Sequence, residues 1–188
     1  MRIVFMGTPD FSVPTLKALV EAGHDVAAVV TQPDKPKGRG KEMQMTPVKV
    51  QALEYKIPVY QPAKVRDQAF IQVLREMDAD VFVVIAFGQI LPKDVLELPR
   101  YGCVNIHASL LPKYRGAAPI QWCVIDGEKE TGITTMMMDV GLDTGDMLEK
   151  VVIPIGDKET GGSLHDKLSL AGGSLILSTL RKLEEGTA

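Results

Sequence analysis

Ile3-Val-Phe-Met-Gly-Thr-Pro-Asp10 decides the fold, because a short apolar run ends there at a glycine and a proline and a helical pattern follows. Apolar residues recur at helical spacing between positions 13 and 20. Ser12 stands where a helix cap is expected, and Gly23 stands where such a helix would end. A second apolar run, Val26 to Val30, completes a strand-helix-strand unit, and the strands of such a unit should be parallel.

The turn after the first strand reads Gly7-Thr-Pro-Asp10, so it lacks the glycine-rich fingerprint of dinucleotide-binding proteins. A carboxylate at Asp10 would also repel a phosphate that a helix N-terminus otherwise attracts. A plain capping turn and a substrate-contacting turn both remain open for this segment.

Further runs extend the same architecture. Asp80-Val-Phe-Val-Val-Ile-Ala-Phe87 is typical of a central parallel strand that is covered on both faces. Residues 131–138 and 147–153 predict an antiparallel pair of strands, and Met136 to Met138 favour core filling over a soft-metal site. Helices are expected at about 46–53, 67–77, 117–125 and 163–184, the last weakened at Gly172-Gly173. The predicted fold is α/β and Rossmann-like, with a mostly parallel central sheet, helices on both faces and an antiparallel carboxyl-terminal strand pair.

The composition limits the class of protein. A chain of 188 residues with 45% hydrophobic content predicts one domain with an ordinary core. Its net charge of -3 gives no general attraction to nucleic acid, so any such contact needs a local basic patch. Cys103 and Cys123 lack metal-ligand spacing and are expected to be reduced and buried. The start is too short for a signal-peptide core and no run approaches a membrane span, so we expect a cytoplasmic protein without a membrane partner. The expected oligomeric state is a monomer.

A local basic patch lies between residues 32 and 44, where the apolar pattern breaks. Lys35, Lys37, Arg39 and Lys41 occupy alternate positions between prolines and glycines, which indicates a long exposed loop. A solvated loop is one interpretation. Contact with RNA phosphates is the favoured one, because the loop follows the second strand at the sheet edge where ligands bind.

Asn105-Ile-His-Ala-Ser-Leu-Leu-Pro112 follows the apolar pair Cys103-Val104, which reads as the end of a buried strand. Asn105 and His107 are two residues apart, so both side chains should point to one face of the sheet. Polar groups at the carboxyl end of a strand indicate an active site, because ligands bind there in open α/β sheets. The alternative is that His107 is only a hydrogen-bonded residue closing a strand.

Two other segments could contact a ligand. Gly88-Gln-Ile-Leu-Pro92 ends the central strand, and with Phe87 it offers backbone groups and apolar walls to a planar heterocycle, although spacing alone favours a simple connecting loop. Residues 139–146 hold two glycines and three carboxylates, which predicts a tightly shaped turn. The calcium-loop pattern is absent there.

Several motifs together resemble the 10-formyltetrahydrofolate-dependent formyltransferases: Asn105-Ile-His107, Ser109-Leu-Leu-Pro112 and Gly141-Leu-Asp-Thr-Gly145. Met6-Gly-Thr-Pro-Asp-Phe11, the basic segment and Arg115-Gly-Ala-Ala-Pro-Ile-Gln121 are similar to the methionyl-tRNA formyltransferases within that family. Members of that group carry a further carboxyl-terminal β-barrel that also grips tRNA. The resemblance implies that residues 1–188 are the catalytic domain without this barrel, and that about 163–188 form its final helix and the start of a linker.

The resemblance also implies roles for individual residues. The catalytic trio would be Asn105, His107 and Asp143. The residues expected to contact the folate are Phe87, Gly88, Gln89, Ile90, Leu91, Ser109, Leu110, Leu111, Pro112 and Asp139. Those expected to contact the acceptor end of the initiator methionyl-tRNA are Lys35, Lys37, Arg39, Lys41 and Arg115. The co-substrate would be 10-formyltetrahydrofolate, and no metal is required.

The chemistry needs these residue types. Formyl transfer from a folate nitrogen to an α-amino group passes through a tetrahedral oxyanion, which the Asn105 amide and a charged His107 imidazole can stabilise. A neighbouring carboxylate at Asp143 favours the charged imidazole and, with a bound water, can carry the proton of the attacking amine to the departing nitrogen. Two alternatives remain: a formyltransferase for glycinamide ribonucleotide or an amino sugar nucleotide, and a non-catalytic folate- or RNA-binding module.

Overall fold

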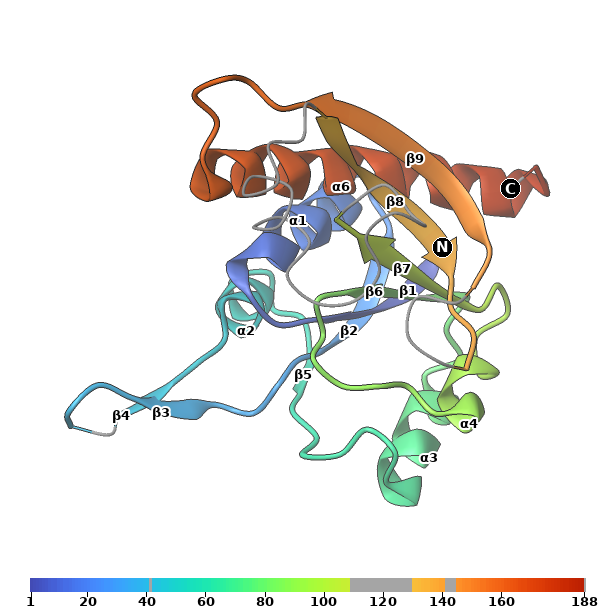
Figure 1. Ribbon diagram of the computed structural model, residues 1–188. Coiled ribbons are helices and arrows are strands. Elements are labelled where there is room, and N and C mark those ends of the chain that lie inside the picture. The colour runs from blue at the N-terminus through green and yellow to red at the C-terminus, as the bar shows by residue number, and fades with distance from the viewer. Residues whose placement is uncertain (41, 109–129, 141–144, 188) are drawn as a thin grey trace.

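The computed structural model describes residues 1–187 except 41, 109–129 and 141–144. Its centre is a seven-stranded sheet in the order β5-β2-β1-β6-β7-β8-β9 (Figure 1). Five strands run parallel: β1 (Arg2–Gly7), β2 (Asp25–Val30), β5 (Val59–Tyr60), β6 (Val81–Ile85) and β7 (Cys103–His107). The last two, β8 (Glu130–Met137) and β9 (Met147–Pro154), are antiparallel to their neighbours. The predicted α/β fold with a mostly parallel sheet and an antiparallel carboxyl-terminal pair is therefore confirmed.

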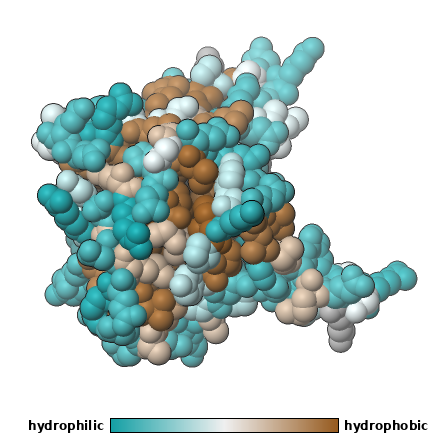
Figure 2. Space-filling view, turned by 180° about the vertical axis from the view of Figure 1, so that it is seen from behind, coloured by the Kyte–Doolittle hydropathy of each residue, from teal (hydrophilic) through white to brown (hydrophobic). Residues whose placement is uncertain are grey.

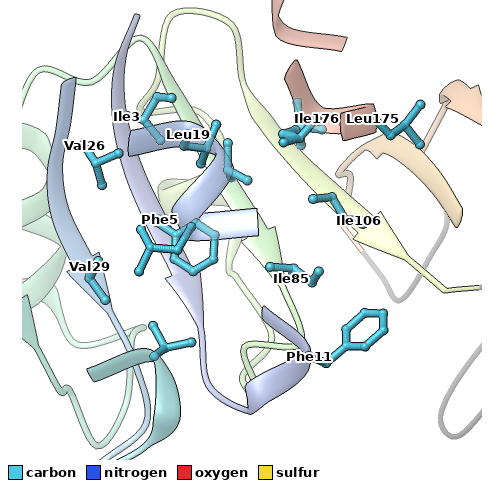
Figure 3. Close-up of a cluster of buried hydrophobic side chains, with 14 of the residues drawn as sticks. Ile3, Phe5, Phe11, Leu19, Val26, Val29, Ile85, Ile106, Leu175 and Ile176 are labelled. Carbon is cyan, nitrogen blue, oxygen red and sulfur yellow. The ribbon is translucent and has the colours of Figure 1, made fainter. Parts of the chain in front are cut away.

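Helices cover both faces of the sheet because the central strands are apolar on both sides. One apolar cluster joins Phe5, Val83 and Ile106 to residues of α1 (Val13–Glu21), α2 (Pro47–Glu54) and α6 (Gly161–Glu185), as Figure 3 shows in part. On the opposite face, a second cluster joins Phe82 and Val84 to α3 (Gln68–Glu76) and α4 (Lys93–Leu96). The helix boundaries agree with the prediction to within two residues at the starts of α2 and α6. Thr46 caps α2 by accepting a 3.1 Å hydrogen bond from the Lys49 amide.

The prediction that the final helix is weakened at Gly172-Gly173 is wrong. The helix α6 continues through Gly172 and Gly173, and both glycines are buried against α1. A Cβ atom on Gly173 would lie 3.1 Å from the Ala18 Cβ and 3.1 Å from the Pro14 carbonyl oxygen. The two glycines therefore let the backbones of α1 and α6 approach closely, and that contact outweighs their low helix propensity.

A second correction concerns Ser12. It is the N-cap residue of α1 by position, but its side chain makes no capping bond and its Oγ donates a 2.6 Å hydrogen bond to the Ile85 carbonyl oxygen. A short 3-10 turn, η1 (Asp10–Ser12), precedes the helix. Ser12 therefore ties the first turn to the end of β6.

The expected long exposed loop at residues 32–44 contains a β-hairpin of β3 (Lys35–Lys37) and β4 (Glu42–Gln44). We call Lys35–Gln44 the basic hairpin. Every described residue in it is exposed, so no burial pattern marks the strands in the sequence. It projects from the body of the molecule (Figure 1), and its surface is mostly hydrophilic (Figure 2). In the described part of the chain, no helix has the length and apolar character to span a membrane.

Candidate active site

Asn105 and His107 lie in β7, between the parallel strand β6 and the antiparallel strand β8. Val104 and Ile106 pack into the cluster under α1 and α6, and Cys103 packs into the cluster under α3 and α4. Because side chains alternate along a strand, Asn105 and His107 point to the same face as Cys103. Asn105 is half-buried and His107 is 8% exposed. The two predicted groups therefore share one face at the carboxyl end of the strand.

The predicted ligand loop, residues 87–91, lies beside this pair. Val84 of β6 is opposite Asn105, so the chain leaves β6 at the level of Ile106. Phe87 and Leu91 are 2% and 3% exposed and belong to the apolar cluster on the same face as Asn105. Ile90 is 76% exposed, so it is the apolar side chain of this loop that remains available to a ligand.

The side chain of Gln89 is fully used in holding this loop. Its Nε2 donates to the Gln32 Oε1 at 2.9 Å and to the Pro62 carbonyl oxygen at 3.0 Å, and its Oε1 accepts from the Val65 amide at 2.7 Å. An amide with both its donors and its acceptor engaged has little left to offer a ligand. The prediction that Gln89 contacts a folate therefore concerns its main chain.

Thr8 and Gln32 also belong to this edge of the sheet. Thr8 lies in the turn for which substrate contact remained open, and Gln32 was not among the expected site residues. The Thr8 Oγ1 donates a 2.7 Å hydrogen bond to the Phe87 carbonyl oxygen and accepts one of 3.3 Å from the Gln32 amide. The chain runs outward from β1 in opposite directions on its two sides, and ligands bind at such switch points. Thr8 directly follows β1, and Gln32 is the second residue after β2, so a search for polar residues after every strand would have found both.

The basic hairpin is anchored at its base. The Lys49 Nζ lies 3.0 and 3.1 Å from the two carboxylate oxygens of Asp34, and the Gln61 Nε2 donates a 2.7 Å hydrogen bond to the Asp34 Oδ1. The hydrogen bond from Gln61, followed by that from Lys49, lowers the pKa of the Asp34 carboxyl. The Thr31 and Thr46 hydroxyl groups share a 2.7 Å hydrogen bond across the same base.

The basic hairpin has two different sides. Lys35 and Lys37 lie opposite Gln44 and Glu42, whereas Pro36 lies opposite Met43. Alternation therefore places the two lysines on one side and the Pro36–Met43 pair on the other. Arg39 is exposed in the connecting turn, while Lys41 and Arg115 lie outside the described residues.

Asp139 lies away from the carboxyl end of β7. Thr134 of β8 is opposite His107 and Met137 is opposite Val104, so β8 ends near the start of β7. The Met138 amide donates a 2.8 Å hydrogen bond to the Cys103 carbonyl oxygen, and the exposed Asp139 follows directly.

Several predicted site residues lie outside the described residues: Asp143, Ser109, Leu110, Leu111 and Pro112. The same is true of the expected helix at 117–125 and of Cys123.

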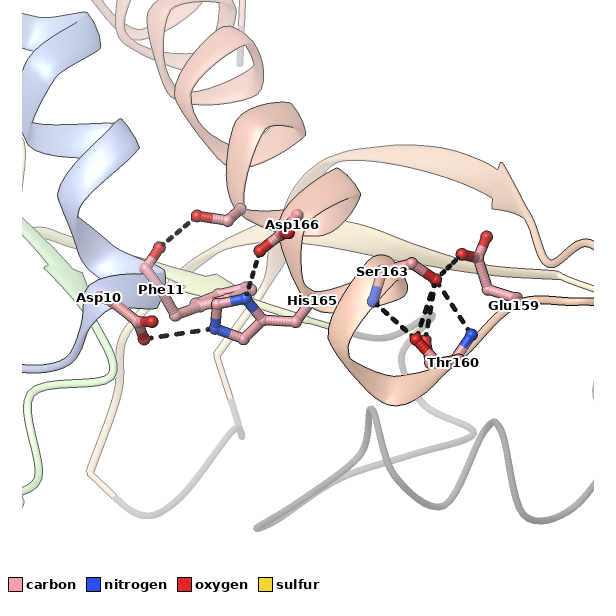
Figure 4. A network of polar contacts seen from close by, with 8 residues as sticks. Asp10, Phe11, Glu159, Thr160, Ser163, His165 and Asp166 are labelled. Atoms are coloured by element: carbon pink, nitrogen blue, oxygen red, sulfur yellow. Dashed lines mark hydrogen bonds and ion pairs between the residues drawn. The ribbon is translucent and has the colours of Figure 1, made fainter.

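Two further groups bear on the site's chemistry. Asp10, in the turn after β1, faces His165 of α6, whose Nε2 lies 3.4 Å from its Oδ1 (Figure 4). The carboxylate is 76% exposed, so it faces solvent at this turn. Burial raises the pKa of the Cys103 thiol to about 12, so this cysteine is an inert core residue. Across the described ranges, no three His, Cys, Asp or Glu side chains gather as a metal site would require.

The chain is similar over its whole length to proteins named methionyl-tRNA formyltransferase. It is 63% identical over 188 residues to that of Agathobacter rectalis, covering all of this chain and 61% of that protein. It is 62% identical over 187 residues to that of Geobacter metallireducens, and 56% identical over 188 residues to that of Clostridioides difficile. Both matches include 100% of this chain, and they include 60% and 61% of the two relatives, respectively. It thus spans about three fifths of the length of these curated relatives.

Solved structures share the fold. The phosphoribosylglycinamide formyltransferase of Bacillus halodurans superimposes with a TM-score of 0.79 at 23% identity, covering 97% of this chain and 95% of that one. The sugar 3N-formyl transferase WlaRD gives a TM-score of 0.71 at 21% identity, covering 100% of this chain and 64% of that one. At these identities the likeness concerns the fold alone. A family model described as "Formyl transferase" matches residues 1–180, and the chain therefore belongs to the formyl transferase family.

Proposed function

We propose that this chain transfers the formyl group of 10-formyltetrahydrofolate to the α-amino group of methionyl-tRNA, which yields the formylmethionyl-tRNA that begins translation. The observation that carries the proposal is the 56–63% identity, over the whole chain, to proteins named methionyl-tRNA formyltransferase. Asn105 and His107, side by side on one face of β7 and next to the loop at residues 87–91, support it.

The reaction makes one bond and breaks one. The α-amino nitrogen attacks the formyl carbon, and the carbonyl oxygen gains negative charge in the tetrahedral intermediate. The bond to the folate nitrogen then breaks, and the proton of the attacking amine moves to that nitrogen. The Asn105 amide and the His107 imidazolium stabilise the oxyanion, and Asp143 orients His107 and takes part in the proton transfer.

The basic hairpin is the proposed contact to the acceptor end of the tRNA. Lys35 and Lys37 stand together on one of its sides, so they can reach successive phosphates. We place the folate against the exposed Ile90 and the main chain of residues 87–91. In this proposal residues 1–188 form the catalytic domain, about 163–188 form its final helix and the start of a linker, and the enzyme acts in the cytoplasm as a monomer.

The alternative acceptors carry phosphate, as glycinamide ribonucleotide does. The turn after β1 argues against them, because Asp10 presents an exposed carboxylate where a phosphate would be expected. Incubation with 10-formyltetrahydrofolate and either methionyl-tRNA or glycinamide ribonucleotide, with release of tetrahydrofolate as the signal, separates the two. Faster release with glycinamide ribonucleotide would overturn the proposed acceptor.

The catalytic roles are tested in the same assay. His107→Ala and Asp143→Asn should each lower the transfer rate by about 100- to 1,000-fold or more, since each removes a group that acts at the transition state. His24→Ala is the matched control, because His24 lies before β2 at the opposite end of the sheet and contacts the N-terminal amine. Activity within a fewfold of the wild type, with an unchanged thermal melt, would remove His107 or Asp143 from the mechanism.

A further inference from the structure

Three glutamines join the basic hairpin to the loop at residues 87–91. We call Gln32, Gln61 and Gln89 the amide bridge. They come from three connections that follow β2, β5 and β6, so the sequence keeps them well apart. Each of the three is linked to the next by a hydrogen bond, and the bridge spans the carboxyl edge of the sheet.

At the hairpin end, the bridge begins at a rigid base. Asp34 directly precedes β3, and Lys49 lies in α2, which begins at Pro47, after Met45 and Thr46 have followed the hairpin. Their ion pair at 3.0 Å and the Thr31–Thr46 hydrogen bond at 2.7 Å close the two stems on each other. Because the segments before and after the hairpin are joined in this way, we expect Asp34 to move together with the hairpin when the hairpin is displaced.

Gln61 carries that movement to Gln32. Its Nε2 donates to the Asp34 Oδ1 at 2.7 Å and to the Gln32 carbonyl oxygen at 3.2 Å. One NH₂ group thus holds both the base of the hairpin, through Asp34, and the main chain of Gln32 just after β2. Since partly buried amides are costly to leave without partners, the two segments should move together.

Gln32 then reaches the ligand loop in two ways. Its side-chain Oε1 accepts a hydrogen bond from the Gln89 Nε2. Its main-chain N–H donates to the Thr8 hydroxyl, which in turn donates to the Phe87 carbonyl oxygen. Its side chain also lies across Gly88, because a Cβ atom on Gly88 would be 2.7 Å from the Gln32 Nε2. The described bonds therefore place Gln32 at the junction of the hairpin and the loop.

We propose that Gln32 is a positioning residue that couples binding at the basic hairpin to binding at the loop of residues 87–91. The inference rests on the proposed function, in which the hairpin binds tRNA and the loop binds the formylfolate. When one ligand fixes its segment, the amide bridge orders the other segment in advance, so each ligand strengthens the binding of the other. Coupling of this kind is reciprocal by thermodynamic necessity.

The test measures this coupling directly. The dissociation constant of fluorescently labelled methionine-accepting tRNA is measured by anisotropy, with and without saturating 5-formyltetrahydrofolate, and the ratio is the coupling factor. We expect a factor of about five or more for the wild type. Gln32→Met and Gln61→Met should each lower this factor toward one, because each removes one link of the bridge, while leaving the affinity for tRNA alone nearly unchanged. Methionine keeps the length of the side chain and the main-chain bonds of Gln32, but it has no amide.

The control is Gln72→Met, because Gln72 is exposed on α3 and, among the described residues, its side chain bonds to Glu76 and Arg75 of its own helix. It should keep the wild-type factor. A variant that merely loosens the fold would lower its melting temperature and weaken both single affinities, which separates a structural role from a positioning one. If Gln32→Met does not fold, Gln61→Met breaks the same bridge at its other link.

The outcomes are distinct. If the wild type transfers formyl groups to methionyl-tRNA but its coupling factor is one, the coupling is refuted and the proposed function stands. A factor that stays at the wild-type value in the bridge variants also refutes it. If the wild type neither transfers formyl groups to methionyl-tRNA nor binds it, the proposed function fails and the coupling fails with it.

Discussion

Replacing Gly88 by alanine tests how the ligand loop is held. Gly88 has a φ of +95°, and an added Cβ atom would meet the Gln32 Nε2 at 2.7 Å. The substitution therefore strains the backbone and also pushes aside a side chain whose hydrogen bond to Gln89 secures the loop. Gly23 offers a matched control, because it has a φ of +86° and nothing lies within 4 Å of its added Cβ atom.

The two variants separate these costs. Gly23→Ala should lower the free energy of unfolding by about 1–2 kcal/mol, the cost of a left-handed conformation for a residue with a Cβ atom. Gly88→Ala should lower it by a further ~0.5–1.5 kcal/mol, because it also sacrifices the hydrogen bond between the amides of Gln32 and Gln89. For a chain of this size, that difference corresponds to a melting temperature about 1–6 °C below that of Gly23→Ala.

Urea unfolding followed by circular dichroism gives the two free energies, and the formyl transfer assay gives the KM for 10-formyltetrahydrofolate. We expect the KM to rise for Gly88→Ala and to stay at the wild-type value for Gly23→Ala. If the two variants unfold at the same urea concentration and share the same KM, Gln32 has no part in fixing the loop and the expectation is refuted.

Three other perturbations have defined outcomes. Burial raises the pKa of Glu149, but hydrogen bonds from Lys182, Thr179 and Ser178 and the charge of Lys182 lower it below its ordinary 4.5. The folded-state pKa is thus the lower one, so this stabilisation is present above pH 4.5 and is lost as pH falls. Urea unfolding at about pH 6 and about pH 3.5 should show a smaller loss of stability for Glu149→Gln than for the wild type, and equal losses would contradict this role. Gly173→Val should cost about 1–3 kcal/mol in thermal unfolding by forcing α1 and α6 apart, while Gly161→Val, with nothing within 4 Å of its added Cβ atom, should cost less. Replacing the three described cations of the basic hairpin by glutamine should flatten the salt dependence of tRNA binding by about 0.7–0.9 in log–log slope for each phosphate that is no longer neutralised. An unchanged slope would show that the hairpin does not touch the RNA.

The strands of the sheet could be predicted because buried strands consist of consecutive apolar residues, which are visible in the sequence. The run from Val81 to Ile85 is buried on both faces, and its sequence is apolar without interruption. The start of α2 near Thr46 could be predicted because the signals for it are local, and the partner of the Thr46 side chain, the Lys49 amide, is only three residues away. The joint placement of Asn105 and His107 followed from the two-residue period of a strand.

The features that were missed depend on partners far along the chain. Ser12 bonds to Ile85, 73 residues away, in place of its own helix. Gln89 bonds to Gln32, 57 residues away, and this bond gives its side chain a structural use that no local pattern indicates. The strands of the basic hairpin are exposed on both sides, so their ladder of hydrogen bonds has no counterpart in hydrophobic periodicity.

The pairing of Pro36 with Met43 determines which side of the basic hairpin each side chain occupies. Inserting or deleting a single residue in β3 or β4 would rotate the remaining side chains of that strand by half a turn, and would bring lysine to the side that now carries Pro36 and Met43. A change of two residues in each strand would lengthen or shorten the hairpin and preserve both sides. Its reach can therefore vary in evolution or by design only in even steps per strand, if the charged side is to keep its orientation to the rest of the molecule.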